Sequence, residues 1–143
     1  SLAKCDDFRS DPAWIAKRLG ITSKEAKSAI ERLVKLAILK RSTTGKLTPT
    51  KKVVKTSEDR FEPSIRHSHR ENLHLAEDAL DRWNVATREF TAVTVAVEKK
   101  RMAELKKTIR KFRDEFLVDA EAGRRDDVYR LSIQFFPLTQ EFP

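Results

Sequence analysis

The first clear pattern of apolar and polar positions predicts a helix over residues 12–19. The apolar face of that helix consists of Trp14, Ile15 and Leu19. Asp11 can accept the free amide hydrogens at the helix start, and Pro12 suits the first helical position because its missing N–H costs nothing there. Gly20 follows the segment and can adopt the left-handed conformation that ends many helices. We therefore expect a short amphipathic helix that ends in a tight turn.

A second helix is predicted over residues 24–36. Thr22 and Glu25 precede and open it at the spacing of a capping box, in which each side chain accepts a hydrogen bond from the other residue's backbone N–H. On a helical wheel one side is apolar and should be buried. This side consists of Ala26, Ala29, Ile30, Leu33, Val34, Leu36 and Ala37.

Two short β-like runs follow, residues 38–42 and 46–50, and Gly45 lies between them. A tight hairpin turn often needs a residue with positive φ, which glycine adopts without strain. Helix, turn, helix and hairpin in this order are typical of a winged helix-turn-helix, with the hairpin as the wing. Residues 1–10 are too few for the first helix of such a domain. Either that helix begins upstream in a longer parent protein, which we expect, or a later helix fills the gap.

Beyond the polar connector at residues 51–59, helical spacing returns over residues 64–83, which we interpret as a linking helix. It contains all three histidines of the chain. His67, Glu71 and His74 fall at i, i+4 and i+7, a spacing that could hold a metal ion, but a fourth ligand and a known zinc signature are missing. We expect surface or hydrogen-bonded histidines here, with no metal and no cofactor.

The last third of the chain predicts a β-α-β unit. Residues 88–97 are rich in β-branched side chains, residues 98–122 carry a charged helix with a narrow apolar seam, and residues 128–136 alternate between apolar and polar. Two parallel strands joined by a right-handed crossover are the default arrangement. Two strands alone make a poor sheet, which is a physical reason to expect a homodimer through this half.

The predicted fold is therefore α+β: a winged helix-turn-helix module (residues 1–60), then a linking helix with a β-α-β regulatory or dimerisation module (residues 61–143). The net charge of +8 is concentrated in the first part. Residues 1–60 carry 15 Lys and Arg against 7 Asp and Glu, whereas residues 61–143 carry 15 of each. A basic module of this size favours a nucleic-acid partner.

Other classes of protein are disfavoured by composition. The single cysteine excludes an internal disulfide and CxxC-type metal or redox motifs, which fits a reducing cytoplasm. No apolar run reaches the length of a membrane span, so we expect no membrane partner. The chain has no nucleophile elbow, Gly-rich phosphate loop or zinc pattern, so we do not expect an enzyme.

Several stretches together resemble one bacterial family, the Fibrobacter major paralogous family. They are DPAWIAKRLGI, GKLTPT, HRENLHLAEDAL, REFTAVTVAV and DVYRLSIQFFPLT. The resemblance covers nearly the whole chain, and its members are generally described as transcriptional regulators whose C-terminal region is a domain of unknown function. It implies a regulatory role, but it brings no catalytic residue or ligand.

The leading hypothesis is thus a module of a transcriptional regulator that binds double-stranded DNA, with the second helix in the major groove and the wing on phosphates. The candidate DNA-binding residues are Ser23, Lys24, Lys27, Ser28, Arg32, Lys35, Arg41, Thr44, Lys46, Lys51 and Lys52. Glu31 lies in the middle of this face, where it could accept from a cytosine or repel the DNA backbone. The alternative is a protein-interaction or dimerisation domain of winged-helix shape that does not bind DNA.

Overall fold

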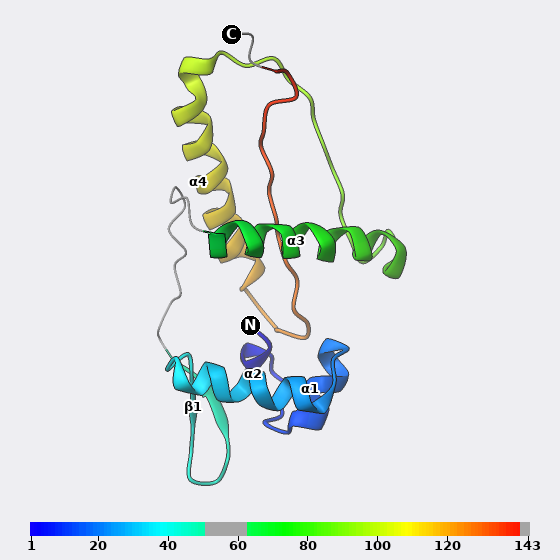
Figure 1. The fold of residues 1–143 in the computed structure, drawn as a ribbon, viewed down its shortest axis with the longest axis vertical. Coiled ribbons are helices and arrows are strands. Elements are labelled where there is room, and N and C mark those ends of the chain that lie inside the picture. Colours follow the sequence, from blue (N-terminus) through cyan, green and yellow to red (C-terminus); the bar gives the residue numbers. More distant parts are fainter. Residues whose placement is uncertain (51–62, 141–143) are drawn as a thin grey trace. The chain divides into compact units, whose positions relative to one another are not determined.

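The computed structural model describes residues 1–50 and 63–140 (Figure 1). These residues form four α-helices, two 3-10 helices and one two-stranded antiparallel sheet, which confirms the predicted α+β class. The chain divides into two compact units. The first comprises Ser1–Lys55 and Val118–Tyr129, and the second comprises Thr56–Leu117 and Arg130–Pro143. A segment from the last third of the chain therefore belongs with the N-terminal elements, an arrangement that the sequence pattern did not indicate.

Helix α1 (Pro12–Leu19) begins and ends at the predicted signals. The Asp11 carboxylate accepts hydrogen bonds from the backbone N–H groups of Ala13 at 3.3 Å and Trp14 at 2.9 Å. Gly20 is left-handed, with φ 66° and ψ 32°. Both ends are thus fixed by residues adjacent in sequence, which explains why local patterns were sufficient to predict them.

Helix α2 (Ser23–Lys35) opens with the predicted capping box. The Thr22 backbone N–H donates to Glu25 Oε2 at 2.8 Å, and the Glu25 N–H donates to Thr22 Oγ1 at 3.2 Å. Its C-terminal end was predicted wrongly. The wheel placed Leu36 and Ala37 on the buried face, but both are exposed because the helix stops at Lys35 and Ala37 turns left-handed with φ 55°.

The hairpin consists of strands β1 (Leu39–Arg41) and β2 (Leu47–Pro49), each shorter than the runs predicted. They pair antiparallel, with Lys40 opposite Thr48. Gly45 has φ 82°, as the turn required, and the Ser42 N–H donates to the Lys46 carbonyl oxygen at 2.9 Å.

The first unit has a small apolar core between α1, α2 and the hairpin. Its buried residues are Ile15, Ala16, Ala26, Ile30 and Leu47, and its partly buried neighbours are Leu2, Phe8, Trp14 and Val34. Leu2 lies in a 3-10 helix, η1 (Leu2–Lys4), and Phe8 meets Trp14 edge to face with ring centroids 5.9 Å apart. The residues before α1 therefore complete the core of this unit, although they form only one turn.

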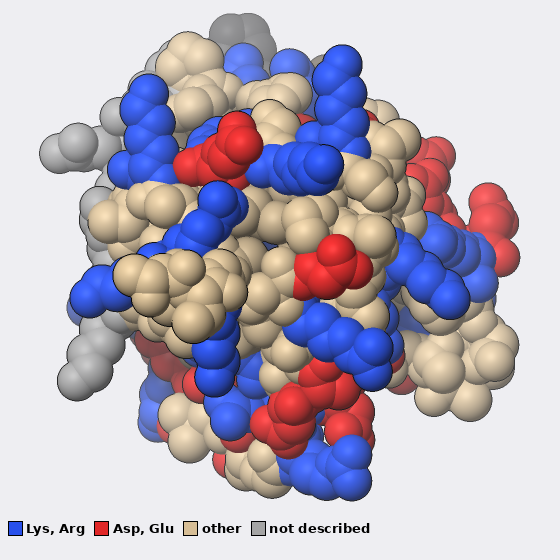
Figure 2. Space-filling model, turned by 90° about the horizontal axis from the view of Figure 1, so that it is seen from below, with Lys and Arg blue, Asp and Glu red and all other residues tan. Residues whose placement is uncertain are grey.

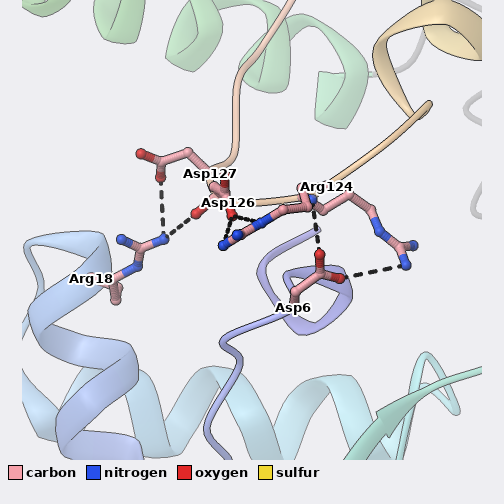
Figure 3. Close-up of polar contacts among 6 residues, drawn as sticks. Asp6, Arg18, Arg124, Asp126 and Asp127 are labelled. Atoms are coloured by element: carbon pink, nitrogen blue, oxygen red, sulfur yellow. Dashed lines mark hydrogen bonds and ion pairs between the residues drawn. The ribbon is translucent and has the colours of Figure 1, made fainter.

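Residues 118–129 are attached to the first unit by polar contacts (Figure 3). Arg18 Nη2 donates to the Asp126 carbonyl oxygen at 2.8 Å and lies 3.4 Å from a carboxylate oxygen of Asp127. Asp6 and Arg125 exchange two hydrogen bonds, from each backbone N–H to the other residue, both at 3.1 Å. Lys4 pairs with Glu121 at 2.9 Å, and this ammonium group lowers the pKa of the Glu121 carboxyl. We call these contacts the clasp.

The second unit contains helix α3 (Pro63–Arg82), the 3-10 helix η2 (Lys99–Arg101) and most of α4 (Met102–Ala120). Both long helices lie close to the predicted ranges. The apolar seam predicted on α4 is only half covered. Met102, Leu105 and Ile109 are half-buried, whereas Phe112 and Phe116 are exposed by 53% and 45%.

The predicted β-α-β unit is not present among the described residues. Residues 88–97 and 128–136 form no strand, and none of their side chains is buried. β-branched residues favour an extended backbone, but a strand also needs a neighbour that accepts and donates its backbone hydrogen bonds, and no described segment does so. The alternation itself is retained, since the Gln134 side chain donates to the Ser132 hydroxyl at 2.6 Å on the polar side.

Candidate nucleic-acid interface

The orientation of α2 determines which of its side chains face solvent. Ala26 and Ile30 are buried at 0% and 4% exposure and anchor one side of the helix in the core. The opposite side is free of contacts with the core. All six candidate residues on this helix are exposed, namely Ser23, Lys24, Lys27, Ser28, Arg32 and Lys35. Glu31 is exposed among them.

The hairpin presents its own candidates. Arg41 is the last residue of β1, and Thr44 and Lys46 belong to the loop, all three exposed. The loop is held by its hydroxyls: Ser42 Oγ lies 2.8 Å from Thr44 Oγ1 and accepts from the Lys46 N–H at 3.0 Å. Lys51 and Lys52 lie outside the described residues.

A shallow depression of about 370 Å³ joins the two elements. From α2 it is lined by Lys27, Ile30 and Glu31, and from the hairpin by Arg41, Gly45 and Leu47. The structure therefore brings Lys27 and Arg41, 14 positions apart in sequence, to one surface with Glu31. The remaining candidates do not line the depression.

The charge around this depression is strongly positive. Residues 10–50 contain nine Lys and Arg residues against three carboxylates, a net charge of +6. Two of the three carboxylates, Asp11 and Glu25, are bound at helix starts. Hydrogen bonds from the Thr22 hydroxyl and backbone N–H hold the pKa of Glu25 below its ordinary value. Only Glu31 makes no hydrogen bond or ion pair with a described residue, so it is the one carboxylate of this segment left available to a ligand.

The candidate cations on α2 and the hairpin are not neutralised by any described carboxylate. Among the described residues, no carboxylate oxygen lies within 4.0 Å of the charged nitrogens of Lys24, Lys27, Arg32, Lys35, Arg41 or Lys46. Seen from the side of the hairpin, Lys and Arg side chains are spread over the surface, with smaller acidic areas between them (Figure 2). The clasp differs, because Lys4, Arg18 and Arg125 each have a carboxylate partner.

Residues 1–138 match a protein family described as a domain of unknown function, DUF4423. The chain belongs to this family. The match covers α1, α2 and the hairpin as well as α3, α4 and the segments on either side of α4. No protein with a curated description and no solved structure matches the chain. The DUF4423 description states no activity, so it assigns no role to the residues of the depression.

Sequence reasoning missed the polar residues of the clasp, which this DUF4423 chain uses to attach residues 118–129. Arg18 contacts residues 108 and 109 positions away, and Asp6 contacts a residue 119 positions away. No helical or strand periodicity links such positions. The only signal in the sequence was two adjacent dipeptides of opposite charge, Arg124-Arg125 and Asp126-Asp127. This charge pattern does not identify the residues that they contact.

The histidine-bearing face of α3 does not gather a ligand set. His67 Nε2 lies 3.3 Å from Glu71, and His74 Nδ1 lies 3.6 Å from Glu77, so the two histidines pair with different carboxylates. Within residues 1–50 and 63–140, no cluster of three or more metal-ligating side chains is found. In the same residues, none of the helices combines the length and the apolarity that crossing a bilayer would need.

Proposed function

We propose that residues 1–50 form a winged helix-turn-helix that binds double-stranded DNA, with α2 in the major groove and the hairpin on phosphates. The observation that carries this proposal is the depression between α2 and the hairpin. Lys27 and Arg41 line it from two different elements, and neither has a carboxylate partner among the described residues. Two elements that converge on one basic surface match the way in which such modules contact a groove and its flanking backbone.

The dimensions and chemistry of α2 support a groove contact. Its 13 residues give a rod about 20 Å long, and the major groove, about 12 Å wide, admits a single helix. Lys24, Lys27 and Lys35 can donate to guanine O6 and N7, and Arg32 can join them from the edge of the face. Ser23 and Ser28 offer hydroxyls to either bases or phosphates. The exposed face has no Asn or Gln for adenine, so phosphate attraction supplies most of the affinity.

Glu31 gives the interface a distinctive feature. A carboxylate on the groove-facing side repels phosphates, but it can accept a hydrogen bond from the amino group of cytosine. Because Glu31 has no partner within the described residues, its charge acts directly on whatever occupies the depression. It therefore weakens non-specific binding while favouring sites that place a cytosine opposite it.

The biological role that follows is transcriptional regulation in the cytoplasm. The resemblance of this chain to the Fibrobacter major paralogous family supports that role, since those proteins are described as regulators. The alternative, a winged-helix-shaped protein-interaction domain without DNA binding, remains the outcome to be distinguished by experiment.

The test is fluorescence anisotropy of a labelled generic duplex titrated with the 143-residue protein across a salt series. For about 4–6 phosphate contacts, log K should fall against log salt with a slope of roughly −4 to −5. The double variant Lys27→Gln, Arg41→Gln removes two contacts and should flatten the slope by about 1.8. A separate Glu31→Gln variant should bind the generic duplex more tightly than wild type at every salt concentration.

The matched control is Lys107→Gln, Lys111→Gln, which removes the same charge from the exposed surface of α4. It should leave the salt slope unchanged, because α4 takes no part in the interface. Equal losses in both double variants would mean that only net charge matters, and α2 would then not be the DNA-binding element. No binding by wild type at low salt would refute the DNA-binding proposal for this chain and favour the protein-interaction alternative.

A further inference from the structure

The second unit leaves its apolar side chains uncovered. Within residues 63–140 no side chain is buried, whereas the first unit has a core. The exposed aliphatic side chains include Val93 at 87%, Val95 at 59% and Ile133 at 41%. Phe112 and Phe116 on α4 form an exposed aromatic pair, with ring centroids 6.1 Å apart. A unit of this composition needs another surface against which to bury these groups.

Two extended segments of the second unit also have backbones that no described segment pairs with. Residues 89–97 follow α3 and residues 130–136 follow the clasp, and Figure 1 draws both as extended stretches. Their backbone N–H groups and carbonyls make no hydrogen bond to any described backbone group. The first segment is rich in β-branched residues, and the second alternates apolar and polar side chains, which are the two properties of segments that form sheets.

We propose that these two segments pair as β-strands with those of a second copy of this chain, forming a closed homodimer through the second unit. The inference is independent of DNA binding, because it uses no residue of α2 or the hairpin. It accounts for the failure of the predicted β-α-β unit: the strand signals are present, and the missing neighbour is supplied by the partner.

The exposed apolar area is large enough for a stable dimer. An aromatic side chain that is about half exposed offers roughly 75–125 Å² to a partner, and a half-exposed Val, Leu or Ile offers less. The second unit carries about a dozen such side chains on the two segments and α4. Covering them would bury on the order of 1,000 Å² per protomer, about 2,000 Å² in total, which is the size of obligate homodimer interfaces.

Charge favours a second copy over a nucleic acid or a strongly charged protein as the occupant. Residues 61–143 carry 15 basic and 15 acidic side chains, a net charge of zero, so two copies of this half do not repel each other. Apolar and polar side chains alternate along residues 130–136, so each copy has an apolar side and a polar side at the same positions. The apolar sides of two copies can therefore pack against each other. In a two-fold symmetric dimer each segment pairs with a segment of the other copy, and both copies use the same surface, so association stops at two copies.

The experiment is sedimentation velocity of the full chain over about 1–100 µM, because the population of a dimer depends on protomer concentration. The monomer has a mass of 16.5 kDa, and wild type should sediment at twice that mass in the upper part of the range. Ile133→Lys charges the apolar face of the second segment and should restore the monomer. Gln134→Lys places the same charge on the adjacent polar face, and it should remain dimeric.

Backbone amide hydrogen exchange on wild type tests the pairing without relying on a substitution that could unfold the unit. Amides of residues 90–97 and 131–136 should be protected above the dimerisation midpoint and exchange rapidly below it. A wild-type monomer across the range overturns the proposal. A monomer with protected amides also overturns it and indicates that the two segments pair within one chain. Open-ended growth beyond twice the monomer mass would exclude the closed dimer.

Discussion

Replacing Ala37 with glycine should stabilise the first unit, because this residue ends α2 in a conformation that favours glycine. The Ala37 N–H donates to the Val34 carbonyl oxygen and the Ile38 N–H to the Leu33 carbonyl oxygen, both at 2.9 Å. These two bonds form a Schellman motif, in which the residue at the Ala37 position is left-handed and is most often glycine. Ala37 has φ 55° and is the only non-glycine residue with positive φ in the described ranges.

The magnitude follows from two opposing terms. A side chain in the left-handed region costs roughly 1–2 kcal/mol, which Ala37→Gly removes. Glycine loses more backbone entropy on folding than alanine, which costs about 0.5–1 kcal/mol. The Ala37 methyl is exposed, so its loss removes no core contact. The net expectation is a gain of about 0.5–1 kcal/mol in the free energy of unfolding.

Urea unfolding followed by Trp14 fluorescence measures this gain in the first unit alone. The chain has two tryptophans, so a Trp83→Phe background leaves Trp14 as the only reporter, and it lies next to Phe8 at the core. The midpoint should rise in Ala37→Gly with an unchanged m-value. The matched control is Ala29→Gly, the same chemical change in the interior of α2, which should lose about 1 kcal/mol.

The result that would refute this reasoning is a loss in Ala37→Gly equal to that in Ala29→Gly. It would mean that α2 continues through residues 36 and 37 in solution, with Ala37 on its apolar face as the helical wheel predicted. If Ala37→Gly raises the free energy of unfolding and Ala29→Gly lowers it, the backbone conformations at residues 37 and 29 must differ. The pair of variants therefore distinguishes a helix that ends at Lys35 from one that continues through residue 37.

Two further predictions concern the clasp and the start of α2. Arg18→Met should destabilise the first unit by about 1 kcal/mol, because it removes a charged donor to the Asp126 carbonyl oxygen at an exposed site. Urea unfolding should show no comparable loss in the control variant Lys17→Met. Glu25 has a pKa below its ordinary value of 4.5, so its contribution to stability is present above that pH and is lost as the pH falls through the lowered pKa. Unfolding curves of wild type and Glu25→Gln should therefore converge below about pH 4.5, and a constant difference down to pH 3 would contradict this.

Signals carried by adjacent residues predicted the local structure of the first unit well. The helix starts at Asp11 and Thr22, the left-handed Gly20 and the turn at Gly45 each depend on hydrogen bonds or φ values within a few positions. Where a left-handed residue other than glycine ended a helix, the prediction failed. Ala37 ends α2 in the way a glycine normally would, and the apolar wheel pattern ran on past the true end of the helix.

Non-local structure could not be predicted from the same signals. The alternation over residues 128–136 predicts a strand with one apolar and one polar face, but alternation does not identify the strand that pairs with it. The clasp posed the same difficulty, since the ion pair between Lys4 and Glu121 joins positions 117 apart and depends on the folded arrangement of the first unit. The six candidate residues on α2 are placed by the rotation of that helix about its axis, which its apolar face sets, and so their exposure followed from the pattern.

The two proposals concern different units, because the positive charge lies mainly in one unit and the exposed apolar surface in the other. Nearly all of the excess positive charge lies in the part of the chain that has a core of its own, so that part can present cations without a partner subunit. The exposed apolar side chains without a core lie in the second unit, which carries 14 Lys and Arg against 13 Asp and Glu, so association with an identical copy meets little electrostatic repulsion. A dimer that binds two stretches of DNA backbone at once would gain affinity from linkage alone, with no new contact at α2.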